Sequence, residues 1–472
     1  MRRIVLPFAL VAFVSTCATN PATGRRELSL VSESQEIEMG KQGSQEILQS
    51  MPVMPDAVQS YVRSVATPMA AASERPNLPW NFYVLDDATV NAFAFPGGYI
   101  FITRGILTHM NSEAELAGVL GHEIGHVTAR HTAQQITKAQ LAQTGLVIGS
   151  IFSETVANLA GIASTGLQLL FLKYGRDAEH EADELGFRYM TRQNYNPQAI
   201  SSMFEMLQKQ GQLTGGGGGR LPEWQSTHPD PANRVARNEE RLKSFQASGS
   251  LKENRNAFVQ RLDGMVFGEN PREGFFEGNT FNHPDLRFKF VFPQGWRYQN
   301  QATAVVGVSG QQDAVIQLSF AKGTPQEALR GFLGQQGITA GRTSTNPVNG
   351  LQAATGEFQA QTQQGAIAGL ATYIRYGERT YQILAYTPSA KYQGYSNTFF
   401  SSVGSFDRLT DSRALNVQPN RLQVVRIDRD MTIDAFYRNN PTDKIKFEYL
   451  TVLNGVQPGA LLKAGTLVKT VR

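Results

Sequence analysis

The stretch Gly121–His131, read as GHEIGHVTARH, constrains the fold of this chain more than any other part of the sequence. His122 and His126 are four residues apart, so in a helix they lie on one face with Cβ atoms about 5–6 Å apart. Two imidazoles at that spacing can share one Zn²⁺, and Glu123 lies beside them as a base rather than a ligand. The alternative is a helix on which two histidines happen to flank a glutamate. We predict a buried helix that carries metal ligands.

The residues around this stretch indicate how the helix begins and packs. Ser112 with Glu115 three residues later is a capping-box pattern, which marks a helix start. Gly121 and Gly125 each weaken a helix by about 1 kcal/mol relative to alanine, which indicates close approach of another backbone or of substrate. Apolar residues recur at helical spacing: Leu116, Val119, Leu120, Ile124 and Val127.

The segment Arg176–Arg192 (RDAEHEADELGFRYMTR) is expected to supply the third ligand from a second helix. Helical periodicity places Glu179 and Asp183 on one face that continues into an apolar stripe. A buried carboxylate needs a partner, so Glu179 is the predicted third ligand, and Asp183 could hydrogen-bond a ligating histidine. His180 is the competing ligand, and a charged helix in solvent is the alternative. A solvent-facing side is expected for Glu181, Glu184, Arg188 and Arg192.

Two strand-like segments precede the histidine pair. Trp80–Leu85 is followed by a turn, and Asn91–Ile102 (NAFAFPGGYIFI) contains Pro96 and two glycines. A proline and glycines inside a strand-like run indicate a bent strand at the edge of a sheet. Such an exposed edge could pair with an extended peptide, which would add as another strand. The alternative is a hairpin without a ligand role.

Three later segments concern access to this site. Ala142–Leu172 is apolar but interrupted by polar residues, which favours a buried or lid-like helical pair over a transmembrane span. Gly215–Gly219 is a run of glycines and predicts a mobile loop. His228 is followed by Pro229 and Pro231. It either belongs to a helix-capping turn or serves as a fourth metal contact or an oxyanion donor near the zinc.

The first residues of the chain predict export and lipid attachment. Two arginines followed by the apolar run Ile4–Val14 are typical of a signal peptide, which we assign to residues 1–16. The run ends in VSTC, which resembles a bacterial lipobox, so we expect Cys17 to be lipidated and to begin a tether over residues 17–35. An ordinary cleaved signal peptide beside a stray cysteine is the alternative. Cys17 is the single cysteine, so no disulfide can form within the chain.

Length and charge indicate a multidomain protein that does not bind nucleic acid. A chain of 472 residues exceeds one ordinary core, and about three domains are expected for that length. The formal net charge of +4 is too small to indicate a basic surface that binds nucleic acid.

Two further domains are expected after the metal-binding one. Residues 264–408 combine alternating strands, such as 286–292, with a helix start at 324–327 and a hairpin turn at 376–379, and predict an α+β domain. The beginning of this domain loosely resembles the PsbP-like fold. Residues 419–472 resemble a LysM-type module, a βααβ unit associated with peptidoglycan. A module used only for protein contact is the alternative.

Four motifs together resemble a known family. HEIGH at 122–126, E-x-E-A-D at 179–183, NAFAFPGGYIF at 91–101 and STHP at 226–229 occur in the order found in the membrane-associated gluzincin metallopeptidases. That family includes the CAAX prenyl endopeptidases, HtpX, BepA and LoiP. The resemblance implies a mainly α zincin-type domain with a small edge β-sheet, which we place at residues 36–250.

The resemblance also implies roles for individual residues. It places one Zn²⁺ per chain on His122, His126 and Glu179, with Glu123 as general base and Asp183 as partner of the metal site. His228 matches a histidine that can close over the zinc and hold the enzyme latent in periplasmic members. The substrate-pairing strand corresponds to Asn91, Ala92, Phe93, Gly97 and Gly98.

These expectations lead to three functional hypotheses. The first is a zinc endopeptidase that cleaves unfolded or misassembled envelope proteins, lipid-anchored in the inner leaflet of an outer membrane or soluble in the periplasm. The second is a chaperone-like assembly factor whose metal site is mostly latent. The third is a peptidoglycan-binding adaptor. The presence of Glu123 beside a full set of ligands favours the first, because a scaffold would not need a base.

Overall fold

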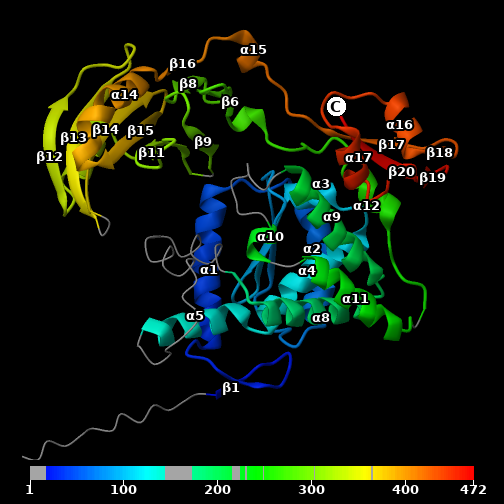
Figure 1. The fold of residues 1–472 in the computed structure, drawn as a ribbon. Helices are drawn as coiled ribbons and strands as arrows, with labels where there is room; N and C mark the ends of the chain where they lie inside the picture. Colours follow the sequence, from blue (N-terminus) through cyan, green and yellow to red (C-terminus); the bar gives the residue numbers. More distant parts are fainter. Residues whose placement is uncertain are drawn as a thin grey trace, which may run out of the picture.

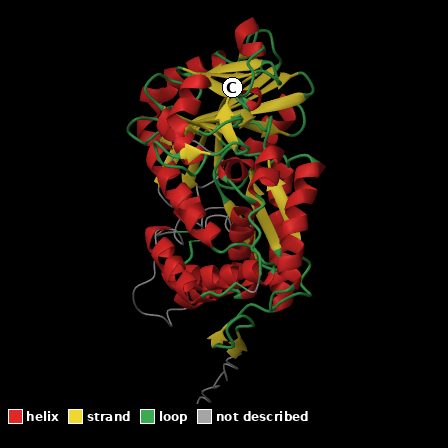
Figure 2. Ribbon diagram, turned by 90° about the vertical axis from the view of Figure 1, so that its right-hand side faces the viewer, coloured by secondary structure: helices red, strands yellow, loops and turns green. Residues whose placement is uncertain are grey.

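A computed structural model describes most of the chain and shows a helical part followed by a strand-rich part (Figure 1). The described residues are 17–143, 173–214, 224–228, 231–247, 249–301, 303–362 and 365–472. The predicted signal peptide at 1–16, nearly all of the predicted helical pair at 142–172, the glycine run at 215–219 and Pro229 lie outside them. Among the described residues, no helix is both long and apolar enough to cross a membrane. Figure 2 shows most strands in the upper half of the molecule, where helices also lie, and mainly helices in the lower half.

The predicted tether at 17–35 is instead folded onto the helical part. Strands β1 (Cys17–Thr19) and β2 (Arg26–Leu28) pair antiparallel as a short hairpin. Asn20, which lies in this hairpin, is buried, and its Nδ2 donates to the carbonyl of Ala129 at 3.3 Å. These backbone and side-chain hydrogen bonds compensate the polar groups of the segment, which therefore does not behave as a free linker.

Two helices follow this N-terminal hairpin. Helix α1 (Glu33–Ser50) begins after Ser32, because Ser32 and Gln35 form a capping box there. Helix α2 (Asp56–Ala71) continues through Pro68. Both helices pack near a small sheet that lies ahead of the histidine pair.

That sheet has three strands in the order β3-β5-β4, namely β3 (Asn81–Leu85), β5 (Tyr99–Thr103) and β4 (Ala92–Phe95). The segment predicted as one bent strand is therefore a tight hairpin, because Gly97 and Gly98 adopt φ of +77° and +99°. Strand β4 does lie at the sheet edge. Its residues are buried, and no further strand pairs with its outer edge among the described residues.

Helix α4 (Glu113–Thr128) carries the histidine pair and begins at Ser112, as predicted. It crosses α8 (Arg176–Arg192) at glycines of both helices. A Cβ placed on Gly125 would lie 2.9 Å from the carbonyl oxygen of Ala182, and one on Gly186 would lie 2.9 Å from the amide of His122. The close approach that the glycines indicated is thus that of the backbone of α8. Around this pair lie α3 (Arg104–His109), α5 (His131–Gln143), α9 (Gln198–Thr214), α10 (Trp224–Thr227), α11 (Pro231–Ser244) and α12 (Arg255–Arg261).

The middle part of the chain is built on two antiparallel sheets. The larger has the order β12-β13-β14-β15-β11-β10-β9 and the smaller β16-β8-β7-β6. Helix α13 (Pro325–Leu333) starts at the predicted capping box of Thr324, and the predicted turn at 376–379 joins β14 to β15. The strand bounds are β6 (Phe275–Glu277), β7 (Thr280–His283), β8 (Phe288–Val291), β9 (Arg297–Asn300), β10 (Val305–Val308), β11 (Val315–Ala321), β12 (Ile338–Ser344), β13 (Ala353–Thr362), β14 (Gly365–Tyr376), β15 (Arg379–Pro388) and β16 (Asp407–Arg408).

Two helices cover opposite faces of the larger sheet. On β14, Leu370 and Ile374 share a core with helix α14 (Tyr392–Gly404), whereas Ala371 and Tyr373 share another with α13. Alternate residues of a strand point to opposite faces, so the two cores lie on opposite sides of the sheet. An α+β arrangement results, as the sequence indicated. Short 3₁₀ turns η1 (Pro271–Glu273) and η2 (Ser389–Lys391) and helix α15 (Ser412–Leu415) complete this part.

The C-terminal part has two helices between two paired strands, the βααβ order that the sequence indicated. Strands β17 (Leu422–Arg426) and β20 (Leu467–Val471) pair antiparallel, and a small pair joins β18 (Met431–Thr432) to β19 (Leu461–Leu462). Helices α16 (Ile433–Asn439) and α17 (Phe447–Leu453) lie between them in the chain. Apolar residues of this part belong to the same buried cluster as those of the first helices. The C-terminal part therefore shares a core with the helical part.

Candidate metal centre

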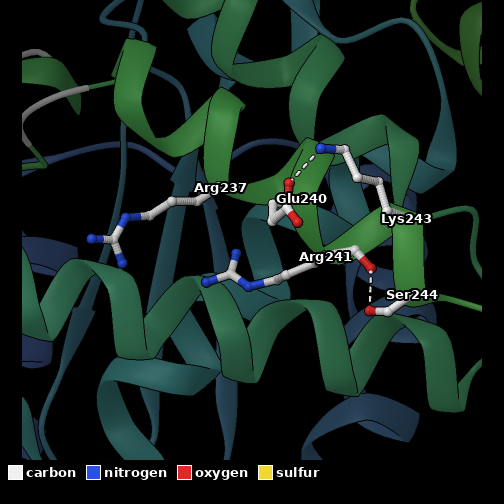
Figure 3. Close-up of a pocket in the computed structure, with 5 residues that line it drawn as sticks. All are labelled: Arg237, Glu240, Arg241, Lys243 and Ser244. Carbon is white, nitrogen blue, oxygen red and sulfur yellow. Dashed lines mark hydrogen bonds and ion pairs between the residues drawn. The ribbon is translucent and has the colours of Figure 1, made fainter.

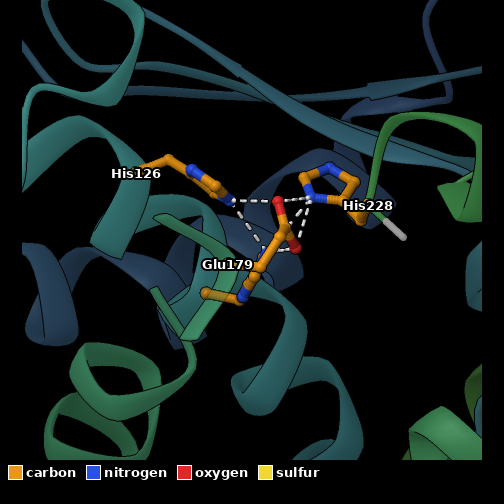
Figure 4. Close-up of side chains that lie close together, drawn as sticks. His126, Glu179 and His228 are labelled. Atoms are coloured by element: carbon orange, nitrogen blue, oxygen red, sulfur yellow. Dashed lines mark hydrogen bonds and ion pairs between the residues drawn. The ribbon is translucent and has the colours of Figure 1, made fainter. Parts of the chain in front are cut away.

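Four side chains from three segments converge on one buried point. His122 and His126 come from α4, Glu179 from α8, and His228 from the residue that follows α10. One ligand atom from each lies within 4.8 Å of the others, and all four residues are buried. Figure 4 shows His126, Glu179 and His228 pointing toward one another. The structure thus brings His228 to the predicted ligands, which favours the metal-contact interpretation over a simple capping turn.

The spacing of the ligand atoms fits a single zinc ion. The Nε2 atoms of His122 and His126 are 2.9 Å apart, and His228 Nδ1 lies 3.2 Å from His122 Nε2. Glu179 Oε1 lies 3.1 Å from His228 Nδ1 and 3.5 Å from His126 Nε2. Four ligands at about 2.0–2.1 Å from a tetrahedral zinc are about 3.3–3.4 Å from each other. The donor set of three imidazoles and one carboxylate is also one that zinc accepts.

Glu123 lies beside this cluster with its carboxylate uncommitted. It is fully buried, and neither of its oxygens accepts a well-formed hydrogen bond from a described residue. Its Oε1 lies 3.7 Å from Nε2 of His228. Burial raises the pKa of Glu123, and this outweighs the opposing effect of His228 and His122. A buried carboxylate of raised pKa next to a metal centre is suited to accept and return a proton.

Asp183 lies beneath His122 and fixes its ring. Its Oδ1 lies 2.9 Å from Nδ1 of His122, so an Nδ1–H that donates to the carboxylate leaves Nε2 free for a metal. Arg234 pairs with Asp183 at two points, Nε to Oδ2 at 2.8 Å and Nη2 to Oδ1 at 2.5 Å. Burial would raise the pKa of Asp183, but the guanidinium of Arg234 holds it well below its usual range.

Arg234 is a site residue that sequence reasoning did not identify. It is fully buried, stacks over the rings of Phe204 and Trp224, and lies 3.0 Å from Oε2 of Glu179. The sequence shows it only as part of a basic helix. Its partner Asp183 is 51 positions away, so no local pattern links the two residues. The buried arginine compensates two buried carboxylates at once.

The charges around Glu179 also favour an ionised ligand. Burial would raise the pKa of Glu179, but His228 and Arg234 together lower it. His180, the competing ligand in the sequence, is not among the clustered residues. The structure therefore separates the two candidates because α8 turns Glu179 toward α4 and leaves His180 only partly buried.

The predicted substrate strand lies next to the metal centre, with its outer edge partly occupied. Asn91, Ala92 and Phe93 lie at the start of β4, and Gly97 and Gly98 form its turn to β5. The amide of Trp224, the first residue of α10, donates to the carbonyl of Val90 at 3.0 Å. The segment that carries His228 thus begins on the chain that leads into β4. Cys17, the predicted lipid-attachment residue, opens β1.

A surface hollow elsewhere carries none of these residues. It has a volume of about 520 Å³ and is lined by Arg237, Glu240, Arg241, Lys243 and Ser244 of α11 (Figure 3). Lys243 pairs with Glu240 within it. Most of its lining residues are charged and exposed, and none of them belongs to the histidine cluster, so we assign it no role in the metal centre.

Part of the chain is similar to a known family of peptidases. Residues 56–242 match the family described as Peptidase family M48. The beta-barrel assembly-enhancing protease of Escherichia coli (strain K12) is 30% identical over 235 residues, which cover 48% of this chain and 47% of the relative. The Yersinia pestis protein of the same name is 31% identical over 226 residues, 46% of each chain. The mitochondrial metalloendopeptidase OMA1 of Arabidopsis thaliana is 34% identical over 168 residues, 35% of this chain and 32% of the relative.

The residues that match the family model lie in the helical part of the chain. The chain spans about half the length of the beta-barrel assembly-enhancing proteases that it matches. Among solved structures, the cyanobacterial PsbP of Synechocystis covers 27% of this chain and 91% of its own, with 13% identity and a TM-score of 0.24. A TM-score that low does not establish a shared fold, so the PsbP-like assignment of the middle part stays a prediction.

Proposed function

We propose that this chain is a zinc-dependent endopeptidase. The observation that carries the proposal is the convergence of His122, His126 and Glu179 on one point with the uncommitted carboxylate of Glu123 beside it. The match of residues 56–242 to a peptidase family supports the same conclusion independently of the geometry. A structural metal site would bury four ligands but would not need a free base next to them.

The residues around the centre divide the work of peptide hydrolysis. Zinc, when bound by His122, His126 and Glu179, supplies a Lewis acid that lowers the pKa of water to about 7. Glu123 accepts a proton from the attacking water and returns it to the nitrogen of the leaving amine, so that its own protonation state is restored. Asp183 holds the ring of His122 in the tautomer that leaves Nε2 unprotonated.

Strand β4 is suited to hold a substrate in an extended conformation. Thr103 donates to the carbonyl of Asn91, so Asn91 faces β5 and the backbone groups of Ala92 point to the other side. Because β4 ends the sheet, an extended peptide can add there as a further antiparallel strand. This pairing uses hydrogen bonds of the substrate backbone rather than its side chains. It favours unfolded polypeptides over folded ones, because only an extended segment can pair in this way.

The physiological setting that we propose follows from the relatives and from the first residues. Two relatives are named beta-barrel assembly-enhancing proteases, which supports misassembled envelope proteins as substrates. Lipidation at Cys17 would hold the enzyme at the inner leaflet of an outer membrane; a soluble periplasmic form is the alternative. The C-terminal part at 419–472 would add contact with peptidoglycan.

A latent state of the same site is the second candidate. His228 Nδ1 lies as close to the ligand atoms as a fourth ligand would, and its segment begins with the hydrogen bond from Trp224 to Val90. In this position the imidazole occupies the place that substrate would need. The chain would then bind zinc but act mainly as an assembly factor until the segment moves.

Casein hydrolysis by the purified chain, with zinc content measured on the same samples, tests both candidates. Glu123→Gln should retain zinc and lose activity by about 10²–10⁴-fold, because it removes proton transfer and keeps the ligands. His228→Ala should raise the activity of a latched enzyme. Glu184→Gln, at an exposed carboxylate of α8, is the control that should change neither zinc content nor rate. Full activity in Glu123→Gln, or a wild type without zinc, would overturn the proposal.

A further inference from the structure

We propose that His131 and Glu181 position His126 for the metal through a hydrogen-bonded chain, which we call the His126–His131–Glu181 relay. The inference rests on the proposed zinc site. His131 Nδ1 lies 2.9 Å from Nδ1 of His126, and His131 Nε2 lies 2.9 Å from Oε2 of Glu181. His131 is buried, and the side chain of Glu181 is 20% exposed.

Proton placement along this chain is determined by its two ends. The carboxylate of Glu181 can only accept, so a neutral His131 ring carries its proton on Nε2. Nδ1 of His131 is then an acceptor, and the proton between the two Nδ1 atoms belongs to His126. This leaves Nε2 of His126 without a proton, with its lone pair facing the other ligand atoms. The relay therefore selects the one neutral tautomer of His126 that can bind a metal.

The turn between α4 and α5 brings His131 into this position. Helix α4 ends at Thr128, and Arg130 adopts a left-handed conformation with φ of 59° before α5 begins at His131. The guanidinium of Arg130 pairs with Glu36 and donates to the carbonyl of Val31 at 2.7 Å, which holds the turn. The backbone thus reverses direction directly after α4 and places His131 beside the ring of His126. Without this turn the fifth residue after His126 would lie on another face of a continuous helix.

A second contact holds the face of the same ring. The ring of Tyr174 stacks on His126 with centroids 4.1 Å apart and an interplanar angle of 24°. The hydroxyl of Tyr174 lies 2.9 Å from Oγ1 of Thr132, the residue after His131. The orientation of the His126 ring is therefore fixed by a hydrogen bond to His131 at its edge and by stacking of Tyr174 on its face. Both contacts come from residues that the motif itself does not specify.

The two ligating histidines are thus supported by different carboxylates of one helix. His122 contacts Asp183 directly, whereas His126 reaches Glu181 through His131. With Glu179 as ligand, α8 supplies all three carboxylates within two turns. The expected solvent position of Glu181 is corrected, because its carboxylate contacts His131, the first residue of α5, and its side chain is 20% exposed.

The relay predicts a loss of zinc affinity that a purely structural contact between α5 and α8 would not produce. Glu181→Ala and His131→Phe should each weaken zinc binding by about 10–100-fold, the range found for partners of ligating histidines. The double variant should lose no more than His131→Phe alone, because both changes break one chain. Glu184→Ala, at an exposed carboxylate on the same helix that pairs with the half-buried Arg188, is the matched control and should bind zinc as tightly as wild type.

Zinc affinity is measured on the full chain by competition with a chromogenic chelator, and the melting temperature of each metal-free variant is recorded. Glu181→Ala should melt with wild type when metal-free and should differ only in affinity. If His131→Phe does not fold, Glu181→Ala alone decides the question. Affinities within twofold of wild type in both single variants would overturn the relay while leaving the zinc site intact. A wild-type chain that binds no zinc would instead overturn the proposed function, and the relay with it.

Discussion

His109 is a buried histidine outside the metal centre, and its surroundings keep the ring neutral. Its Nδ1 donates to the carbonyl of Gly105 at 2.7 Å, and its Nε2 lies 2.7 Å from the hydroxyl of Tyr449 in the C-terminal part. Burial lowers the pKa of His109 from 6.5 to about 4, against the opposing effect of the Gly105 carbonyl. Between these two pH values the unfolded chain takes up a proton at His109 that the folded chain does not. The contribution of His109 to the unfolding free energy is therefore fully present above pH 6.5 and is lost as the pH falls toward 4.

We expect the metal-free chain to lose on the order of 3 kcal/mol of unfolding free energy through His109 as the pH falls from about 6.5 to 4. Urea denaturation at several pH values gives the unfolding free energy of wild type and of His109→Gln. The predicted loss appears as a steeper dependence of this free energy on pH in wild type than in the variant. His283→Gln, in β7 of the middle part, is the control for removal of a histidine. Parallel pH profiles of wild type and His109→Gln would contradict the prediction.

Helices α4 and α8 must cross closely for the two halves of the metal centre to meet. We expect Gly125→Ala to weaken zinc binding about tenfold or more and to destabilise the chain by about 1–3 kcal/mol, because the new methyl group overlaps the backbone of Ala182 and displaces α8. The gain in helix propensity, about 1 kcal/mol, does not offset this. Chelator competition and urea denaturation measure the two effects.

Gly118→Ala provides the control on the same helix. A Cβ there would lie 3.4 Å from Cγ1 of Ile200, an ordinary contact, so the change should keep zinc affinity and stabilise the helix by up to about 1 kcal/mol. If Gly125→Ala behaves as Gly118→Ala does, the crossing distance does not set the geometry of the site.

The C-terminal part is tied to the rest of the molecule through a buried lysine. Lys469 of β20 donates from Nζ to the carbonyls of Thr108 and Met110, at 2.9 and 2.7 Å, at the end of α3 and just before α4. Burial holds the pKa of Lys469 well below its usual range, although Glu115 opposes this effect. The lysine therefore satisfies carbonyls at a helix end that water does not reach.

Lys469→Met keeps the length of the side chain and removes the donor, so it should lower the unfolding free energy by about 1–3 kcal/mol for the carbonyls left without a partner. The helical and C-terminal parts should unfold in one transition, because they share a core. Lys463→Met, at an exposed lysine paired with Asp430, should change stability by less than about 0.5 kcal/mol. Equal stability of the two variants in urea would show that the interface does not depend on Lys469.

The sequence by itself determined those features that depend on neighbours along the chain. Helical periodicity placed His122 and His126 on one face and separated Glu179 from Glu184, and a capping pattern marked Ser112 as the start of α4. Periodicity and turn chemistry also located α13 and the turn between β14 and β15. Each of these features is set by backbone geometry over a few residues, which the order of residue types records directly.

The tertiary structure alone decided which distant residues meet. It brought His228 into contact with the ligands, placed Arg234 beneath them, and gave Glu181 a buried partner in His131. It also folded residues 17–28 onto the helical part and joined the C-terminal part to the same core. These pairings link residues that are tens to hundreds of positions apart, and they arise from the packing of whole helices and sheets. Local sequence patterns do not encode such packing, because the same charged or apolar face can be covered by any complementary surface.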